Sequence, residues 1–142
     1  MTSSGHWKRA HYIGLPIYDR QMQPIILKQD LAREFRTDER CFIFESLNGS
    51  NDCLSVARAR VEPGVTTKWH SVQGTVERYI IAEGKARVEI GDLAPEDIGP
   101  GDVILIPAGV RQRVTNMGKR DLIFYCVCTP PFEQKNYHDL EE

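Results

Sequence analysis

The sequence predicts an all-β domain in which short strands form a sandwich or barrel. Between residues 41 and 128, eight short runs rich in β-branched and aromatic residues alternate with turn-forming pairs such as Asn48-Gly49 and Pro63-Gly64. Turns of this kind suit tight antiparallel connections. Many short strands with regular turns favour a closed β architecture.

The expected elements are joined by short connections. A short helix is expected at 30–35, where Asp30 can cap the N-terminus. The strands are expected at 41–46, 54–61, 66–72, 77–82, 86–90, 102–106, 111–115 and 122–128. We divide the chain into an N-terminal arm and edge segment at 1–39, a barrel at 40–129 and a C-terminal tail at 130–142. Both irregular arms are expected to pack on the barrel or on a partner subunit.

Composition narrows the function classes. The 142 residues carry a net charge of -2 and contain no basic cluster, so we expect no nucleic-acid partner. No apolar run approaches the roughly 18 residues of a membrane span, and no leader is apparent. The sequence therefore predicts a cytoplasmic protein without a membrane partner. Four cysteines are too few for a disulfide scaffold and are expected to be reduced.

Two of these cysteines, Cys126 and Cys128, lie two residues apart in the last predicted strand. Alternation along a strand would place both sulfurs on one face, about 6.6 Å apart. A zinc-binding pair is one interpretation. The simpler one is that they are small apolar fillers of a half-buried strand.

Two spaced motifs carry the chemistry: Gly64-x5-His70-x-Val72-x4-Glu77-x6-Gly84 and Gly101-x5-Pro107-x-Gly109-x2-Gln112-x3-Asn116. In extended strands, His70 shares a face with Lys68 and Val72, and Glu77 shares one with Tyr79. A turn at 73–75 would bring the Glu77 carboxylate beside the His70 imidazole. We expect Gln112 to approach this pair from the opposite sheet.

The two motifs resemble those of the cupin superfamily, over roughly residues 40 to 128, and the chain looks like a small single-domain member. The resemblance implies a double-stranded β-helix, or jelly roll, in which three histidines and a glutamate bind a divalent metal. Here His70 and Glu77 match two ligand positions. Val72 and Gln112 replace the other two histidines.

The substitutions leave His70, Glu77 and Gln112 as the expected metal ligands. Valine has no lone pair, and an amide oxygen is a weaker ligand than imidazole. Such a set would hold Mn, Fe, Ni or Zn weakly, since three protein ligands plus water can retain a catalytic metal. The alternative is a metal-free pocket with a hydrogen-bonded His70–Glu77 pair and Gln112 donating to the ligand.

Other side chains are candidates for substrate contact. Tyr79 can fill the barrel or contact a ligand, and Lys68 can pair with an anionic substrate or remain solvated. Arg58 and Arg60 share one strand face; an outward orientation is expected because unpaired buried charge is unfavourable. The remaining histidines, His6, His11 and His138, are expected at the surface.

Three functions are compatible with this sequence. The first is a metal-dependent enzyme, a dioxygenase, isomerase or lyase, acting on a small oxygenated substrate, with Glu77 as a further candidate base. The second is a metal-free binding or sensor protein for a sugar or carboxylic acid. The third is a metal-free sugar isomerase or epimerase with His70 as base and Tyr79 as acid. The resemblance also implies a homodimer.

Overall fold

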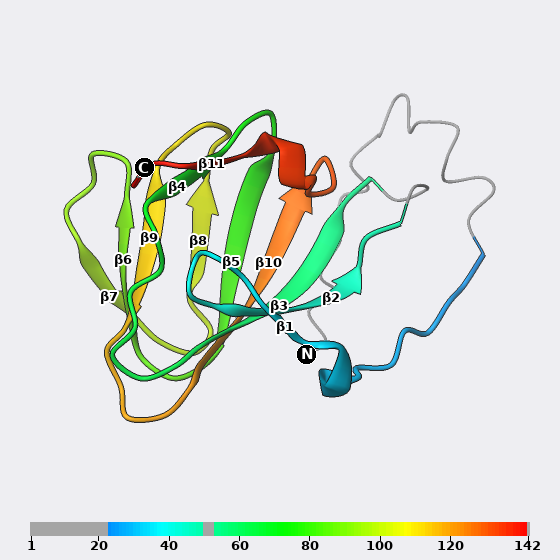
Figure 1. Cartoon of the computed structure of the whole chain (residues 1–142), viewed down its shortest axis with the longest axis horizontal. Coiled ribbons are helices and arrows are strands. Elements are labelled where there is room, and N and C mark those ends of the chain that lie inside the picture. The colour runs from blue at the N-terminus through cyan, green and yellow to red at the C-terminus, as the bar shows by residue number, and fades with distance from the viewer. Residues whose placement is uncertain (1–22, 50–52, 142) are drawn as a thin grey trace, which may run out of the picture.

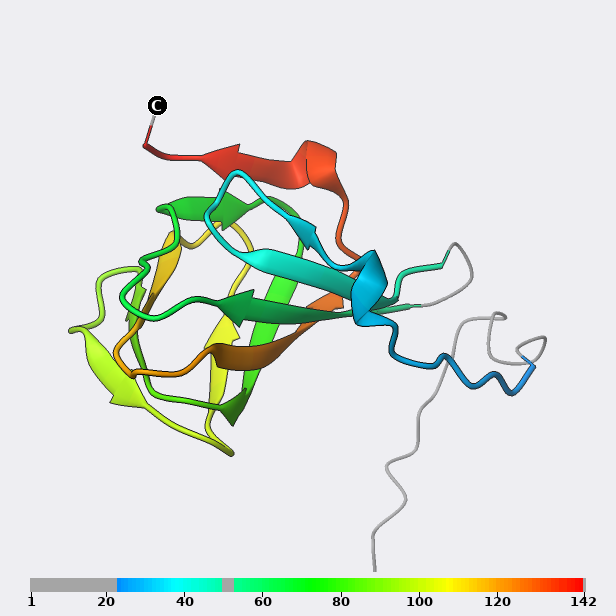
Figure 2. The ribbon, with the colours of Figure 1, turned by 60° about the horizontal axis from the view of Figure 1, so that its bottom comes forward.

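Two antiparallel sheets face each other and enclose the core (Figures 1 and 2). The computed structural model describes residues 23–49 and 53–141. Within these residues the regular elements are β-strands and two short 3-10 helices, so the predicted all-β class is confirmed. His6 and His11, in the first 22 residues of the N-terminal arm, lie outside the described residues. No helix in the described part of the chain has the length and apolar character needed to cross a membrane.

The larger sheet has six strands in the order β1-β2-β3-β10-β5-β8. Its central strands are long and half-buried, because alternate side chains face the core and the outer surface. The strands are β1 (Phe35–Arg36), β2 (Phe42–Leu47), β3 (Ser55–Val61), β10 (Leu122–Thr129), β5 (Val76–Glu83) and β8 (Val103–Ile106).

The smaller sheet has five strands in the order β11-β4-β9-β6-β7. These are β11 (Tyr137–Asp139), β4 (His70–Val72), β9 (Gln112–Asn116), β6 (Ala86–Ile90) and β7 (Glu96–Ile98). The 3-10 helices are η2 (Leu31–Arg33) and η3 (Gln134–Asn136). The predicted helix at 30–35 is therefore one 3-10 turn, capped as expected by the Asp30 side chain on the Ala32 N–H at 3.1 Å.

Apolar side chains from both sheets fill the space between them. The most deeply buried include Val61, Ile81, Ile106, Val114 and Leu122, each at most 2% exposed. They come from β3, β5, β8, β9 and β10, so the core joins strands that are distant in sequence. Burial of this apolar surface is the main source of the barrel's stability.

Gly84 of the first motif and Asn116 of the second stabilise turns and are not ligand positions. Gly84 joins β5 to β6 with a φ of +95°, and an added Cβ would lie 3.1 Å from the backbone of Asp121 and Leu122. Buried Asn116 donates to the Val61 and Arg120 carbonyls, both at 2.8 Å, and accepts from the Gly118 N–H at 2.9 Å. These positions preserve the fold whether or not a metal binds.

The C-terminal segment continues the smaller sheet, which the sequence did not predict. Strand β11 pairs with β4, so Asp139 lies opposite His70; Figure 1 shows β11 in red beside β4. The chain between β10 and β11 is held against β3 by the Phe132 N–H, which donates to Ser55 Oγ at 2.9 Å. Part of the predicted irregular tail is thus a strand of the smaller sheet.

Most predicted strands lie within two residues of their observed bounds. The main exception is the run 66–72: only His70–Val72 forms a strand, and Thr66 contributes an isolated bridge to Thr115. The short strands β1, β7 and β11 were missed. Each has two or three residues, too few to show a period of two.

Candidate functional site

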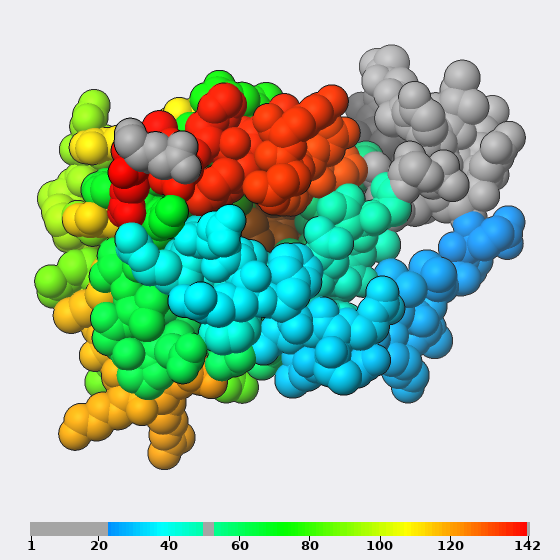
Figure 3. Space-filling view, viewed as in Figure 1, coloured from blue at the N-terminus to red at the C-terminus, as the bar shows by residue number. Residues whose placement is uncertain are grey.

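A cavity of about 730 Å³ lies inside the barrel. This volume is typical of sites for small molecules. The wall combines apolar side chains with polar groups from both sheets. In Figure 3 the surface is hollowed between the red C-terminal segment and the cyan residues near position 40, both of which contribute to the lining.

His70 lies at the start of β4 in the cavity wall and is buried. Its Nδ1 lies 2.8 Å from the Lys68 carbonyl oxygen. Because a carbonyl can only accept, Nδ1 carries the proton and Nε2 is left with the lone pair in the neutral ring. Glu39 Oε2 lies 3.4 Å from the same Nδ1, and the Tyr137 ring stacks on the imidazole with centroids 5.1 Å apart. These contacts fix the orientation of a basic nitrogen.

Glu77 lies near the start of β5 on the opposite sheet and is 5% exposed. Its Oε1 accepts from Gln112 Nε2 at 2.9 Å, and its Oε2 accepts from the Cys126 thiol at 3.0 Å. Burial raises the pKa of Glu77, while the thiol, the His70 charge and the Gln112 amide each lower it to a smaller extent. Both carboxylate oxygens are thus already engaged within the protein.

Gln112 corrects one prediction. It lies on β9 directly opposite His70 in the same sheet, whereas Glu77 is the residue that comes from the other sheet. The Gln112 amide bridges the sheets: its oxygen accepts from the Tyr79 hydroxyl and its nitrogen donates to Glu77. Burial raises the pKa of Tyr79 well above its ordinary value, so this hydroxyl remains the donor.

The predicted hydrogen-bonded pair of His70 and Glu77 is replaced by other contacts. Among the described residues, His70 bonds to Lys68 and Glu77 bonds to Gln112 and Cys126. Both side chains still line the same cavity, as does Tyr79. The sequence therefore identified residues that the fold brings together, but not their partners.

The thiols of Cys126 and Cys128 also line the cavity, and their sulfurs are 3.8 Å apart. The estimate of 6.6 Å was too long because the side chains incline toward each other from a shared strand face. The pKa of Cys126 is raised, first by its contact with Cys128 and then by burial. The C-x-C spacing was the sequence signal for this pair.

The other candidates lie away from the site's polar groups. Lys68 pairs with Asp139 at 2.8 Å, so its ammonium has a partner within the chain. Arg58 and Arg60 both contact Glu34 on the outer face of the larger sheet, at 3.3 Å and 2.6 Å, which agrees with the outward orientation expected for them. His138 is exposed on β11, as expected, and it also contributes to the cavity lining.

Two site residues escaped the sequence analysis. Glu39 and Tyr137 both line the cavity and contact His70. They lie in the arms, about 30 and 70 residues from His70, in segments without a periodic pattern. The pairing of β11 with β4 brings Tyr137 to His70, and the connection between β1 and β2 brings Glu39 there.

The three expected metal ligands do not fit a metal as they are arranged. His70 presents a free lone pair on Nε2, but the Gln112 oxygen accepts from Tyr79 and the Glu77 oxygens accept from Gln112 and Cys126. Val72, at the remaining family position, lines the cavity without a donor atom. A metal at this position would have to share or displace these three hydrogen bonds, so no chemistry is assigned to it here.

Comparison with known proteins agrees with the fold and the motifs. The sequence profile described as "Cupin domain" matches residues 57–128, which is half of the chain. The match covers β3 to β10 and includes His70, Glu77, Gln112 and both thiols. The protein therefore belongs to the cupin family. No curated protein matches the chain by sequence.

Solved structures show the same barrel. Oxalate decarboxylase from Lactobacillus farciminis, in a formate complex, is 20% identical with a TM-score of 0.66; the match covers 76% of this chain and 33% of that one. The protein plu4264 from Photorhabdus luminescens is 22% identical with a TM-score of 0.65, covering 80% and 92%. A Cupin 2 conserved barrel domain protein from Salinispora arenicola is 24% identical with a TM-score of 0.65, covering 76% and 90%.

At these identities the matches establish the fold alone, and the chemistry has to be inferred from the residues of the site. The chain spans about a third of the oxalate decarboxylase and nine-tenths of the two smaller proteins. Its length is thus comparable with that of single-barrel proteins.

Proposed function

We propose that the barrel cavity binds a small, uncharged, hydroxyl-rich molecule and that His70 acts on it as a general base. The observation that carries this proposal is the bond from Nδ1 of His70 to the Lys68 carbonyl, which leaves the basic nitrogen Nε2 in a cavity of about 730 Å³. A base fixed in this way suits proton abstraction beside a carbonyl group. The reaction class is isomerisation or epimerisation of a sugar-like substrate.

The charges around the cavity favour an uncharged ligand over a carboxylic acid. Four acidic side chains contribute to the lining, and none of them forms an ion pair with a lysine or arginine among residues 23–49 and 53–141: Asp38, Glu39, Glu45 and Glu77. Arg36 is the lining arginine, and it is exposed. An anionic ligand would be repelled by this wall. Carboxylates and imidazole accept hydrogen bonds from hydroxyl groups, and Tyr137 and Phe124 offer apolar ring surface.

Binding can be tested with ligands of matched shape and different charge. Thermal-shift and calorimetric titrations would compare neutral aldoses and ketoses with the corresponding uronic acids and amino sugars. We expect a neutral sugar to bind at least about tenfold more tightly than its uronic acid, a difference of about 1.4 kcal/mol. Preferential binding of the acids would contradict the proposal.

Turnover can be followed as exchange of substrate hydrogen for deuterium in heavy water, measured by NMR. We expect His70→Gln to slow this exchange by about 10²–10⁴-fold, the usual contribution of a general base, while binding changes only a few-fold. The control is Lys119→Gln, at an exposed position between β9 and β10 that does not line the cavity, and it should retain exchange.

Binding without exchange in the wild-type protein would favour a second function, that of a binding or sensor protein. The observation behind this alternative is the hydrogen bonding of Gln112 to Glu77 and Tyr79, which holds these two residues of the wall rigidly. Absence of binding by any neutral sugar would refute both functions as stated.

A further inference from the structure

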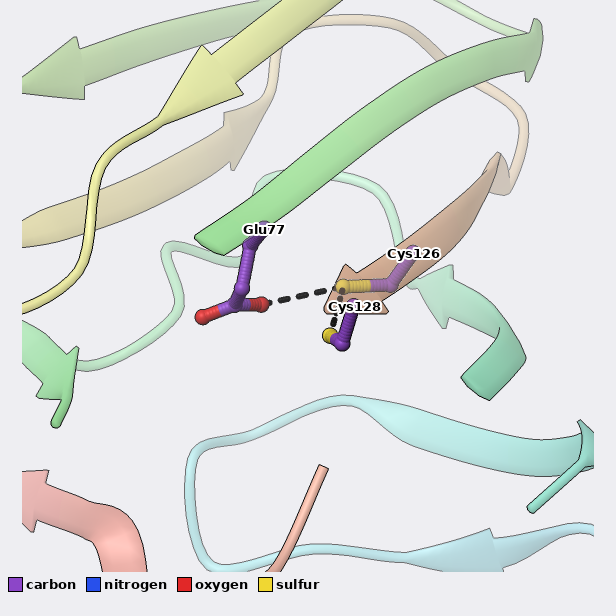
Figure 4. Close-up of side chains that lie close together, drawn as sticks. All are labelled: Glu77, Cys126 and Cys128. Atoms are coloured by element: carbon purple, nitrogen blue, oxygen red, sulfur yellow. Dashed lines mark hydrogen bonds between the residues drawn. The ribbon is translucent and has the colours of Figure 1, made fainter. Parts of the chain in front are cut away.

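Glu77, Cys126 and Cys128 form a compact cluster on the cavity wall. Their ligand-type atoms all lie within 4.8 Å of one another. Cys128 is paired directly with Glu77 across β10 and β5, and Cys126 is two residues away on the same face. Figure 4 shows the three side chains pointing toward one another from the two strands.

The spacing of the sulfurs matches that of two thiolates on one tetrahedral metal. With Zn–S bonds of about 2.3 Å, two sulfur ligands lie about 3.8 Å apart. The Cys126 and Cys128 sulfurs are 3.8 Å apart. A carboxylate oxygen on the same metal would lie about 3.5 Å from each sulfur. The Cys126 thiol now donates to Glu77 Oε2 at 3.0 Å. When this thiol loses its proton to bind a metal, the hydrogen bond is lost, Oε2 becomes free to bind, and the two atoms need to separate only slightly.

The third thiol of the cavity provides an internal comparison. Cys41 also lines the wall and is buried, but its sulfur contacts the Thr37 hydroxyl and the Glu39 carboxylate, each at 3.3 Å. It has the environment of an ordinary buried thiol near polar groups. Cys126 and Cys128 differ from it because they supply two soft ligands on one face beside a buried carboxylate.

We propose that Glu77, Cys126 and Cys128 bind one zinc ion, with the fourth coordination position open to the cavity. Three protein ligands and an open position are the pattern of zinc sites that bind a further molecule. This site uses β5 and β10, whereas the family position would use β4, β5 and β9. It selects a soft divalent ion: Zn, Cd or Co in preference to Mg or Mn.

The test begins with the full-length wild-type protein, stripped with a chelator under reducing conditions and loaded with zinc. Elemental analysis after desalting should give one zinc per chain. Loading with cobalt(II) instead should produce intense thiolate-to-metal charge-transfer absorption, which reports sulfur ligation without any substitution. Zinc at well below one per chain, or a cobalt spectrum without that absorption, would overturn the proposal.

Substitutions then locate the site. Cys126→Ser and Cys128→Ser should each weaken zinc binding by more than about 100-fold, since even outer-shell changes cost 10–100-fold. Glu77→Gln should weaken it while retaining the thiolate absorption. Cys41→Ser is the matched control and should bind zinc like the wild type. Circular dichroism of each metal-free variant shows whether the fold is retained, and Cys126→Ala and Cys128→Ala replace any serine variant that does not fold.

His70→Gln separates the new site from the family position. We expect this variant to retain zinc and the cobalt charge-transfer absorption. Loss of metal on His70→Gln with retention in both cysteine variants would place the ion at the family position and overturn the proposal. Because sugar binding and deuterium exchange are measured separately, either proposal can fail without the other.

Discussion

At the scale of single residues, the motif positions divide into two groups with different tasks. Gly84 and Asn116 satisfy turn geometry that every variant of this barrel needs, and they are unchanged here. Val72 and Gln112 occupy ligand positions, and both depart from histidine. Fold and chemistry can therefore change independently, which explains a chain that keeps all the spacings and loses two ligands.

We expect Asn116→Ala to lower the free energy of unfolding by about 2–3 kcal/mol, because it leaves the buried carbonyl group of Val61 and the partly buried one of Arg120 without their donor. Urea denaturation at neutral pH measures this. Asn48→Ala is the control: the exposed Asn48 amide donates to the Phe132 carbonyl at 3.1 Å, and its loss should change stability by less than about 0.5 kcal/mol. Equal effects of the two substitutions would contradict the role given to Asn116.

At the scale of elements, Glu34 attaches the segment before β1 to the outer face of β3. It accepts hydrogen bonds from Arg60 at 2.6 Å and from Arg58 at 3.3 Å, and its side chain is half-buried. The Arg60 hydrogen bond is the main reason that the pKa of Glu34 lies below its usual value. The carboxylate is therefore more stable in the folded state than in the unfolded chain.

The direction of this pKa shift predicts how the stability of the protein changes with pH. A lowered pKa in the folded state stabilises the protein above the unfolded value of 4.5 and loses that effect as the pH falls through the folded value. We expect Glu34→Gln to cost about 1 kcal/mol at pH 7 and progressively less in acid. Unfolding of both proteins by urea at several pH values measures the difference. Glu96→Gln, at an exposed position, should show no such trend.

The elements also show what a sequence can reveal. Residues 86–90 were predicted with their observed bounds because β6 alternates cleanly between two turns. The pairing of the strands was harder to predict from the sequence. Gln112 was assigned to the wrong sheet because strand pairing depends on contacts between segments far apart in sequence. The same limit hid the interactions of Glu39 and Tyr137 with His70.

At the scale of the whole molecule, exposed apolar side chains gather in two regions. Ile25, Ile26 and Leu27 lie in the extended N-terminal segment, and Val103 and Leu105 lie on β8, which is an edge strand of the larger sheet. Leu105 is 60% exposed and Ile26 is 84% exposed. Unpaired edges with apolar side chains favour association with another chain.

We expect a homodimer in solution, which the family resemblance also implies. Light scattering after gel filtration should give twice the mass of the chain, and Val103→Asp with Leu105→Asp should give the monomer. Leu93→Asp is the control, because Leu93 is comparably exposed in the turn between β6 and β7. A wild-type monomer at micromolar concentrations would contradict this expectation.

The pairing of β11 with β4 has a practical consequence for handling the protein. Tyr137 covers His70, and Glu141 both accepts from the Trp69 N–H at 3.0 Å and pairs with Arg40 at 2.8 Å. Removing residues 130–141 would therefore uncover the imidazole and one edge of the smaller sheet. An affinity tag placed after this segment would follow closely on Asp139, which lines the cavity. Ligand screens are better performed with a tag that is cleaved off or placed elsewhere.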